Sequence, residues 1–322
     1  MKYRNLKGTD LDVSRACFGT MTFGSQVDEA LAATMIDYCL EQGINFFDTA
    51  NMYQQGVSEQ FLGKALRGKR HNIVLASKVR GKMGEAADQV GLSRAAIVRA
   101  VDESLQRLQT DYLDIYYLHQ PDYEVPLEET LEAMQELVNS GKVRYPASSN
   151  YASWQVGTML CLAERQNYKP AVISQQMYNL LARGVEQEFL PMAKELGVSL
   201  IAYNPLAGGL LTGKHHGSSI TPGTRFDKNA MYQDRYWHAQ NFAAVERLQS
   251  LVETTGRSLI SLALNWLMHH TPTDCVILGA SRIEQLKENL AALAEGPLPP
   301  TVVEGCDEVW RDLRGPTPTY NR

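Results

Sequence analysis

Eight short apolar runs alternate with stretches of helical periodicity along this 322-residue chain, and this alternation constrains its fold more than any other feature. The helical stretches include residues 29–42 and 93–108, where apolar side chains recur at steps of three and four residues and Ser93 predicts an N-cap. Strands separated by helices predict a parallel sheet, and at this length we expect it to close into a (β/α)8 barrel, the TIM-barrel form of an α/β protein. The predicted strands are residues 16–18, 44–50, 73–79, 113–119, 143–149, 172–177, 200–205 and 276–280.

The main alternative is an open, doubly wound sheet. Such a sheet commonly carries a Gly-x-Gly-x-x-Gly turn between its first strand and first helix, and this chain has none there. Residues 1–13 predict a β-hairpin lid, and residues 302–313 predict an extra C-terminal helix after the helix at 282–293. No linker-like composition or internal repeat divides the chain, so residues 1–322 are predicted to form a single domain.

The charge and composition of the chain exclude several classes of partner. A formal net charge of -5 argues against binding to nucleic acid or to an anionic membrane. No segment reaches the roughly 18 apolar residues of a membrane span, and the N-terminal segment lacks the apolar core of a secretory signal, so we expect a cytoplasmic protein. The 5 cysteines are scattered without metal-ligand spacing, which predicts reduced, buried thiols and no metal site.

Four residues with complementary chemistry lie at or just past the ends of three predicted strands: Asp48, Tyr53, Lys78 and His119. A tyrosine is a weak acid near neutral pH, and a neighbouring cation such as Lys78 favours its ionised form and so eases release of its proton. A buried lysine needs a counter-charge, which Asp48 can supply, and the His119 imidazole can orient a carbonyl group or share the proton. Together the four predict a proton donor suited to carbonyl chemistry.

Each of these residues also has an ordinary explanation when it is taken singly. A tyrosine after a strand is most often a packing residue, and a histidine after an apolar run is most often a hydrogen-bonded core residue. A lysine within an apolar strand is less ordinary, because lysine is almost never buried without a partner. Their shared position at strand C-termini, where α/β barrels carry their chemistry, favours a common site.

Eight short segments follow one another along nearly the whole chain. They are FGTMTFG (18–24), DTANMYQQGVSE (48–59), ASKV (76–79), DYLDIYYLHQPD (111–122), GKVRYPASSN (141–150), SQQMYN (174–179), YNPLAGGLLTGK (203–214) and GASRIEQLKENL (279–290). In this order and spacing the segments resemble the aldo-keto reductase family. Segments 206–214 and 279–290 are most similar to the branch that holds bacterial aldehyde reductases, aflatoxin-aldehyde reductases and potassium-channel β subunits.

The resemblance implies a barrel that binds NADPH without a Rossmann domain and reduces aldehydes or ketones, with a small-molecule carbonyl compound as substrate. The family's catalytic tetrad falls on Asp48, Tyr53, Lys78 and His119. Tyr53 would be the general acid, Lys78 and Asp48 would tune it, and His119 would orient the carbonyl. The alternative is a redox-sensing regulatory subunit that binds NADP(H) and turns over slowly. A metal-dependent barrel hydrolase, a third possibility, lacks the expected cluster of ligands at the strand ends.

The resemblance also implies where the cofactor binds. Ser149, Asn150 and Gln175 would hydrogen-bond the nicotinamide carboxamide, and Tyr203 would stack on the nicotinamide ring. The full set of predicted cofactor residues is Thr20, Met21, Asp48, Ser149, Asn150, Gln175, Tyr203, Asn204, Pro205, Leu206, Ala207, Gly208, Lys214, Arg225, Gly279, Ser281, Arg282, Gln285, Glu288 and Asn289.

Two segments suit the phosphates of such a cofactor on physical grounds. The small residues of segment 206–209 let backbone N–H groups approach a pyrophosphate closely, and Lys214 adds a cation. Segment 279–282 opens the final barrel helix, whose N-terminus favours an anion, and Arg282 could cover a 2′-phosphate. Arg225 matches a further cation of the family, and Gln285, Glu288 and Asn289 follow at helical spacing toward the adenosine.

The fifth predicted strand departs from the family pattern. It contains Pro146, where relatives carry a small apolar run before the Ser-Asn pair. Proline removes a donor from the ladder, so we expect a bulge or a local irregularity close to Ser149 and Asn150.

Residues 206–238 form a long connection, and long connections inside compact domains tend to be functional. His215 and His216 within it are expected at the surface. The aromatic residues Tyr232, Tyr236 and Trp237 either pack the connection or line the substrate pocket, and the sequence leaves both possibilities open.

Overall fold

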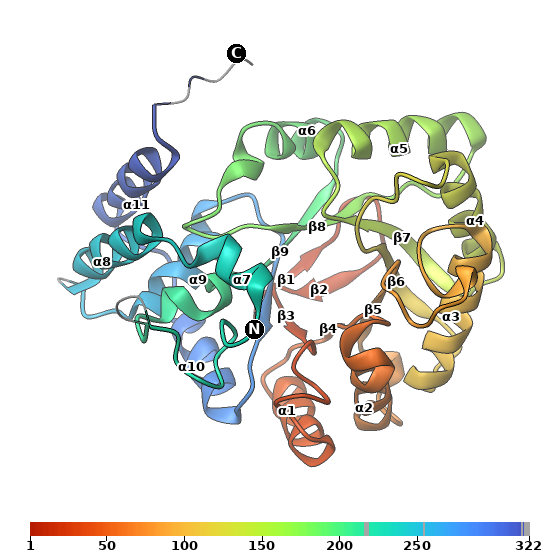
Figure 1. Cartoon of the computed structure of the whole chain (residues 1–322), viewed down its shortest axis with the longest axis horizontal. Helices are drawn as coiled ribbons and strands as arrows, with labels where there is room; N and C mark the ends of the chain where they lie inside the picture. The colour runs from red at the N-terminus through yellow and green to blue at the C-terminus, as the bar shows by residue number, and fades with distance from the viewer. Residues whose placement is uncertain (216–218, 254, 317, 319–322) are drawn as a thin grey trace.

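A computed structural model describes residues 1–215, 219–253, 255–316 and 318, and its centre is a closed parallel barrel (Figure 1). The strands follow one another around the barrel in chain order, and the last pairs with the first. The prediction of a (β/α)8 barrel is therefore confirmed. The barrel strands are β3 (Ala16–Gly19), β4 (Phe46–Asp48), β5 (Val74–Val79), β6 (Leu113–Leu118), β7 (Val143–Ser149), β8 (Ile173–Met177), β9 (Ser199–Tyr203) and β10 (Cys275–Gly279).

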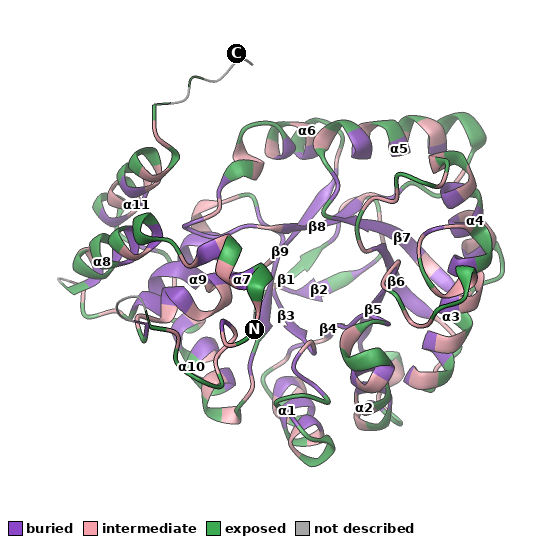
Figure 2. Ribbon diagram, viewed as in Figure 1, coloured by how far each residue is buried: buried purple, intermediate pink, exposed green. Residues whose placement is uncertain are grey.

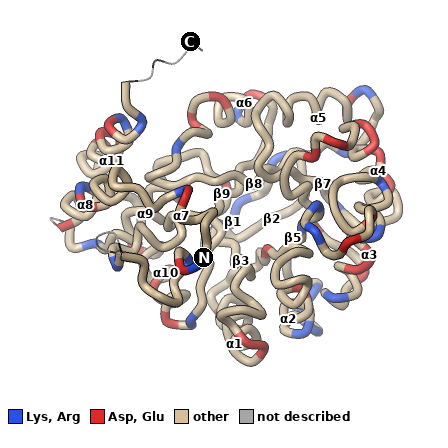
Figure 3. The backbone as a smooth tube through the Cα atoms, viewed as in Figure 1, with Lys and Arg blue, Asp and Glu red and all other residues tan. Residues whose placement is uncertain are grey.

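Helices surround the barrel, and their buried faces turn toward the strands (Figure 2). A second set of buried side chains, including Phe46, Ile115 and Ile201, fills the barrel interior. Charged residues of both signs lie along the outer helices (Figure 3). The helices are α1 (Glu29–Glu41), α2 (Val57–Ala65), α3 (Arg94–Leu108), α4 (Leu127–Asn139), α5 (Ser153–Gln166), α6 (Phe189–Glu195), α7 (Ala230–Tyr236), α8 (Ala239–Glu253), α9 (Leu259–His270), α10 (Ile283–Ala294) and α11 (Pro300–Arg314).

Helix ends coincide with local capping signals. The Ser93 side chain accepts a hydrogen bond from the Ala96 N–H at the start of α3, which confirms the predicted N-cap. Asp28 caps α1 in the same way through the Leu31 N–H. The extra C-terminal helix is present as α11, which packs against α8.

The predicted hairpin consists of β1 (Tyr3–Asn5) and β2 (Asp12–Ser14), which pair antiparallel. Its apolar residues Leu6, Leu11 and Val13 are buried against the side chains inside the barrel. The Lys7 N–H donates to the Ser199 hydroxyl at the start of β9. The hairpin thus closes the end of the barrel at which strands begin, opposite the strand ends that carry the predicted chemistry.

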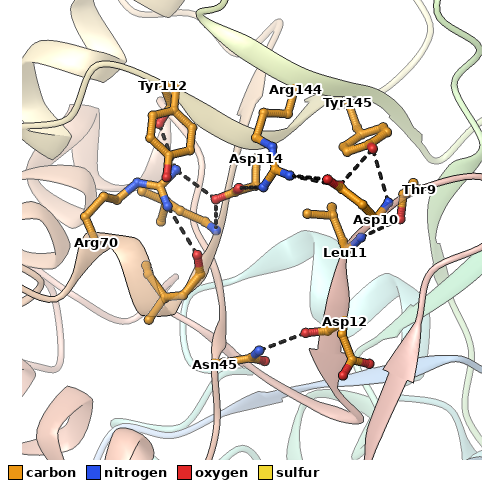
Figure 4. A network of polar contacts seen from close by, with 12 residues as sticks. Thr9, Asp10, Leu11, Asp12, Asn45, Arg70, Tyr112, Asp114, Arg144 and Tyr145 are labelled. Carbon is orange, nitrogen blue, oxygen red and sulfur yellow. Dashed lines mark hydrogen bonds and ion pairs between the residues drawn. The ribbon is translucent and has the colours of Figure 1, made fainter.

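A polar network fastens this hairpin to the barrel wall (Figure 4). Arg144 of β7 pairs with buried Asp114 of β6 at 2.6 Å and with Asp10 of the hairpin at 2.8 Å. The Tyr145 hydroxyl also donates to Asp10, at 2.9 Å. Arg70 pairs with the other Asp114 oxygen at 2.8 Å, so the buried carboxylate has a guanidinium on each side.

The bulge expected at Pro146 is absent. β7 continues through this residue, and Pro146 stands opposite Tyr116 in an uninterrupted register with β6. The pairing of β7 with β8 is short and involves only Ser148 and Ser149. A proline can therefore occupy this strand because the ladder with β8 begins beyond it.

The described part of the long connection contains a turn and a short helix that were not predicted from the sequence. It contains the turn η5 (Ala207–Thr212) and the helix α7, which the Asn229 side chain caps by accepting from the Tyr232 N–H. His215 is buried, with its ring 5.2 Å from Phe226 and 5.5 Å from Trp237 between centroids. The expected surface position of His215 is wrong because aromatic side chains of the same connection cover it; His216 lies outside the described residues. Across the ranges that the structure describes, no helix is long and apolar enough to cross a membrane.

Candidate active site

The core of the site is a buried ion pair between neighbouring strands. Asp48 ends β4 and Lys78 lies near the end of β5, and both side chains are almost completely removed from solvent. The Lys78 ammonium donates to Asp48 Oδ1, donates to the Thr49 carbonyl at 2.7 Å and lies 3.5 Å from the Tyr53 hydroxyl. Burial of a lone ammonium is costly, so the carboxylate and the carbonyl are what allow Lys78 to remain charged.

Tyr53 is held by an unusual turn of the chain. It begins the turn η1 (Tyr53–Gly56), in which Gln54, Gln55 and Gly56 all have left-handed φ angles of 49°, 52° and 89°. Side chains larger than glycine resist this conformation by about 1–2 kcal/mol per residue. Strain of this kind is often retained where a functional side chain must be aimed, and here it directly follows the predicted general acid.

Glu59 supports this turn and was not among the residues predicted from the sequence. It is fully buried in α2, where it accepts from the Ser77 hydroxyl at 2.5 Å and from Arg107 Nε at 2.6 Å. Ser77 directly precedes Lys78, and the Arg107 side chain packs against Gly56. Glu59 therefore links the strand of Lys78 to the turn of Tyr53. The sequence signal that could have identified Glu59 is an acidic residue placed between the apolar positions of α2.

Burial and charge act in opposite directions on the Tyr53 and Lys78 side chains. Burial raises the pKa of Tyr53 above its usual value, although the Lys78 cation lowers it in part. Burial acts to lower the pKa of Lys78, but Asp48 and Tyr53 outweigh it and the pKa is raised. Lys78 therefore acts to lower the pKa of Tyr53, as expected, but burial has the larger effect and the net pKa is raised.

His119 follows β6, and its ring lies in a T-shaped arrangement with that of Tyr53. Its ring centroid lies 6.0 Å from that of Tyr53 with an interplanar angle of 77°. Burial, with the positive charges of Lys78 and Arg80, lowers the pKa of His119 to about 3. The imidazole is therefore neutral at physiological pH, and a neutral imidazole has one N–H to donate.

The predicted nicotinamide residues gather beside these four side chains. The Tyr203 hydroxyl donates to Asn150 Oδ1 at 2.7 Å, and Asn150 Nδ2 donates to the His119 carbonyl at 2.9 Å and to the Ser149 hydroxyl at 3.0 Å. Gln175 Nε2 donates to Asp48 Oδ2 at 2.9 Å. The ends of β7, β8 and β9 are thereby joined to the ion pair of β4 and β5.

The predicted phosphate segment 206–209 has features that suit phosphate. Gly208 and Gly209 have positive φ angles of 69° and 107°, a conformation that favours glycine, and the Asn204 side chain accepts from the Gly208 N–H at 3.2 Å. Burial and the nearby charge of Arg282 lower the pKa of Lys214. A lysine with an arginine close by suits a multiply charged anion, so the residues present fit the phosphates of a dinucleotide.

The remaining predicted cofactor residues differ in exposure. Thr20 is fully buried, and its hydroxyl contacts the Asp48 carbonyl and Ser58, so it forms part of the wall behind the ion pair. Arg225 donates to the Met21 sulfur at 3.2 Å, which joins the loop after β3 to the long connection. The others lie at the ends of β9 and β10, in η5 and along α10: Pro205, Leu206, Ala207, Gly279, Ser281, Gln285, Glu288 and Asn289, of which Pro205, Ala207 and Asn289 are buried.

The aromatic residues of the long connection mainly pack it together. The Tyr236 hydroxyl accepts from Asn179 at 3.1 Å and from Asn204 at 3.3 Å, which fixes α7 to the ends of β8 and β9. Trp237 packs against Phe226 in a tilted contact and against Phe242 in a T-shaped one. Within the part of the chain that the structure describes, no group of three or more His, Cys, Asp or Glu residues is arranged to hold a metal ion.

Comparison with known proteins extends the resemblance over the whole barrel. Residues 15–311 match the model of the Aldo/keto reductase family. The chain is 38% identical to aflatoxin B1 aldehyde reductase member 2 of Rattus norvegicus, over 94% of this chain and 86% of the relative. It is 36% identical to the uncharacterized oxidoreductase YrpG of Bacillus subtilis, over 99% and 98% of the two chains. A probable voltage-gated potassium channel subunit beta of Arabidopsis thaliana is 34% identical over 96% of each. The chain therefore belongs to the aldo/keto reductase family of oxidoreductases.

Proposed function

We propose that the protein is an NADPH-dependent reductase that converts aldehydes or ketones to alcohols, with Tyr53 as the general acid. One observation carries the proposal above the others: the Tyr53 hydroxyl lies 3.5 Å from a lysine whose charge is maintained by buried Asp48. A structural tyrosine does not need a buried cation, whereas a tyrosine that gives up its proton does. The matches to reductases across the chain support the same reaction class.

Each residue of the site has its own role in the proposed reaction. When bound, the reduced nicotinamide supplies a hydride for the carbonyl carbon. Tyr53 gives its proton to the carbonyl oxygen, so that one hydride and one proton together convert the carbonyl to an alcohol. Lys78 stabilises the phenolate left behind, and Asp48 holds Lys78 in its charged form. The neutral His119 donates an N–H to the carbonyl oxygen and orients it.

The reaction is tested by measuring NADPH oxidation in the presence of a panel of aldehydes, ketones, dicarbonyls and sugars. The parent protein should consume NADPH with some members of this panel. Tyr53→Phe should lower kcat by at least about 100-fold, the usual scale of general acid catalysis, and leave NADPH affinity nearly unchanged. Turnover by Tyr53→Phe at the parent rate would show that another group supplies the proton.

A regulatory subunit that binds NADP(H) is the second candidate, because one relative is named as a probable potassium channel subunit beta. The same panel separates the two. Saturable turnover with a common aldehyde supports the enzyme. Tight NADPH binding without saturable turnover of any carbonyl tested supports the subunit.

A further inference from the structure

Gln175 makes a contact across the barrel that the nicotinamide role does not require. Three strands lie between β8 and β4 in either direction around the closed barrel, so the two stand on opposite walls. Gln175 of β8 nevertheless donates from Nε2 to Asp48 Oδ2 of β4 at 2.9 Å, and both side chains are buried. The two side chains therefore meet across the interior of the barrel.

This contact completes the hydrogen bonding of Asp48. One carboxylate oxygen accepts from Lys78 and the other accepts from Gln175. A buried carboxylate with one oxygen left unpaired bears a large desolvation cost and is free to rotate about its terminal bond. Gln175 removes that freedom, and it fixes the plane in which Asp48 meets the Lys78 ammonium.

The backbone of Gln175 joins the other half of the site. Its carbonyl accepts from the Asn150 N–H at 3.1 Å, and the Asn150 side chain contacts His119 and Tyr203. The neighbouring residue Gln176 points to the opposite face of β8, where it donates to the Tyr151 carbonyl and the Ser174 hydroxyl, both at 3.0 Å. Of these two adjacent glutamines, only Gln175 connects with the proton donor.

We propose that Gln175 is a positioning residue for the proton donor, holding Asp48 across the barrel so that Lys78 stays directed at Tyr53. The inference rests on the proposed function and adds a second role to a residue that the family resemblance assigns to the nicotinamide. The N–H of Gln175 also offsets part of the negative charge that Asp48 projects onto Tyr53. Without that N–H, the phenol is a weaker acid and gives its proton more slowly.

The test compares Gln175→Met, which keeps the length and removes the donor, with Gln175→Asn, which keeps an amide but is one methylene too short to reach Asp48. Gln176→Met is the matched control from the same strand.

For each variant, cofactor affinity is measured by quenching of tryptophan fluorescence, and kcat and its solvent isotope effect are measured with cofactor and substrate saturating. We expect kcat to fall by about tenfold in both Gln175 variants, the factor that corresponds to one charge-assisted hydrogen bond, with an increased solvent isotope effect. Gln176→Met should match the parent.

A role limited to nicotinamide binding gives a different pattern. Weaker cofactor affinity with kcat and the isotope effect unchanged at saturation would overturn the proposal. The ionisation of Tyr53 supplies a readout that does not depend on turnover: the ultraviolet titration of the parent minus that of Tyr53→Phe. Gln175→Met should move this step to higher pH, and an unmoved step would contradict the inference even if no carbonyl substrate is found.

Discussion

At the scale of single residues, Lys78 is the charge on which its neighbours depend. Lys78→Met should lower kcat strongly, because Tyr53 loses the cation that stabilises its phenolate. The same change leaves Asp48 buried without its counter-charge, and breaking a buried pair in this way typically costs about 3–5 kcal/mol. Urea unfolding at neutral pH measures this loss. Lys142→Met, which breaks a surface pair with Asp102, is the control and should cost less than about 1 kcal/mol.

The Lys78 pair also has a defined pH dependence. The pKa of Lys78 is raised in the folded state, so its contribution to stability is complete below the ordinary lysine pKa and is lost as the pH rises through the folded value. The parent should therefore lose more stability than Lys78→Met when both are taken to strongly alkaline pH. If the free energy of unfolding fell equally with rising pH in the two proteins, this linkage would be ruled out.

His119 makes the opposite contribution on the acid side. Its folded pKa is lowered to about 3 from the ordinary 6.5, so between these values the folded state binds fewer protons than the unfolded state. Stability should rise with pH through this window and fall on acidification, by at most about 1.4 kcal/mol per pH unit. Denaturant unfolding at several pH values should show a smaller slope for His119→Gln than for the parent.

Exposed His71 provides the control for that slope, since His71→Gln should leave it at the parent value. The kcat profile of the parent should also lack an inflection near the ordinary histidine pKa. An inflection there that disappears in His119→Gln would show that the imidazole is protonated during turnover.

At the scale of elements, the polar network of Figure 4 contains both a buried and an exposed kind of ion pair. Asp114 is buried between Arg70 and Arg144, whereas Asp10 in the hairpin is largely exposed. Asp114→Ala should destabilise the barrel by about 3–5 kcal/mol, because it leaves guanidinium groups without their buried partner.

Asp10→Asn should cost no more than about 1 kcal/mol. Hydrogen exchange should then show faster opening of β1 and β2 alone, and a global change on Asp10→Asn would mean that the hairpin is part of the main cooperative unit.

The elements show what periodicity can and cannot predict. The strands were predicted to within a few residues, because each is a short apolar run between polar turns. The helix α7 was missed because its 7 residues are too few for a periodic signal, although Asn229 before it is a capping signal. The left-handed turn at Gln54 and Gln55 could not be predicted, since neither residue favours that conformation and tertiary contacts impose it.

At the scale of the whole molecule, closure of the barrel assembles the site from distant parts of the chain. β10 pairs with β3, so the end of the last strand lies beside the end of the first. The grouping of these side chains at the strand ends was predictable from the sequence because strands of a parallel barrel all end on one face. The Gln175–Asp48 contact was not, because it depends on the width of the barrel interior, which the pattern of residues does not reveal.

Cofactor binding at this face should therefore stabilise the whole barrel, and it should do so according to the charge of the ligand. A ligand at about a hundredfold excess over its Kd adds about 2.7 kcal/mol, which for a domain of this size corresponds to a rise in Tm of roughly 4 °C. NADPH carries a 2′-phosphate that NADH lacks, and charge-assisted hydrogen bonds to Arg282 are expected to be worth about 1.5–3 kcal/mol. At equal concentration, NADPH should raise Tm clearly more than NADH. Arg282→Ala should reduce the NADPH shift to the size of the NADH shift and leave the latter unchanged, whereas Lys287→Ala on the same helix should preserve the difference. An equal loss for both cofactors in Arg282→Ala would show that this residue maintains the helix start and does not recognise the phosphate.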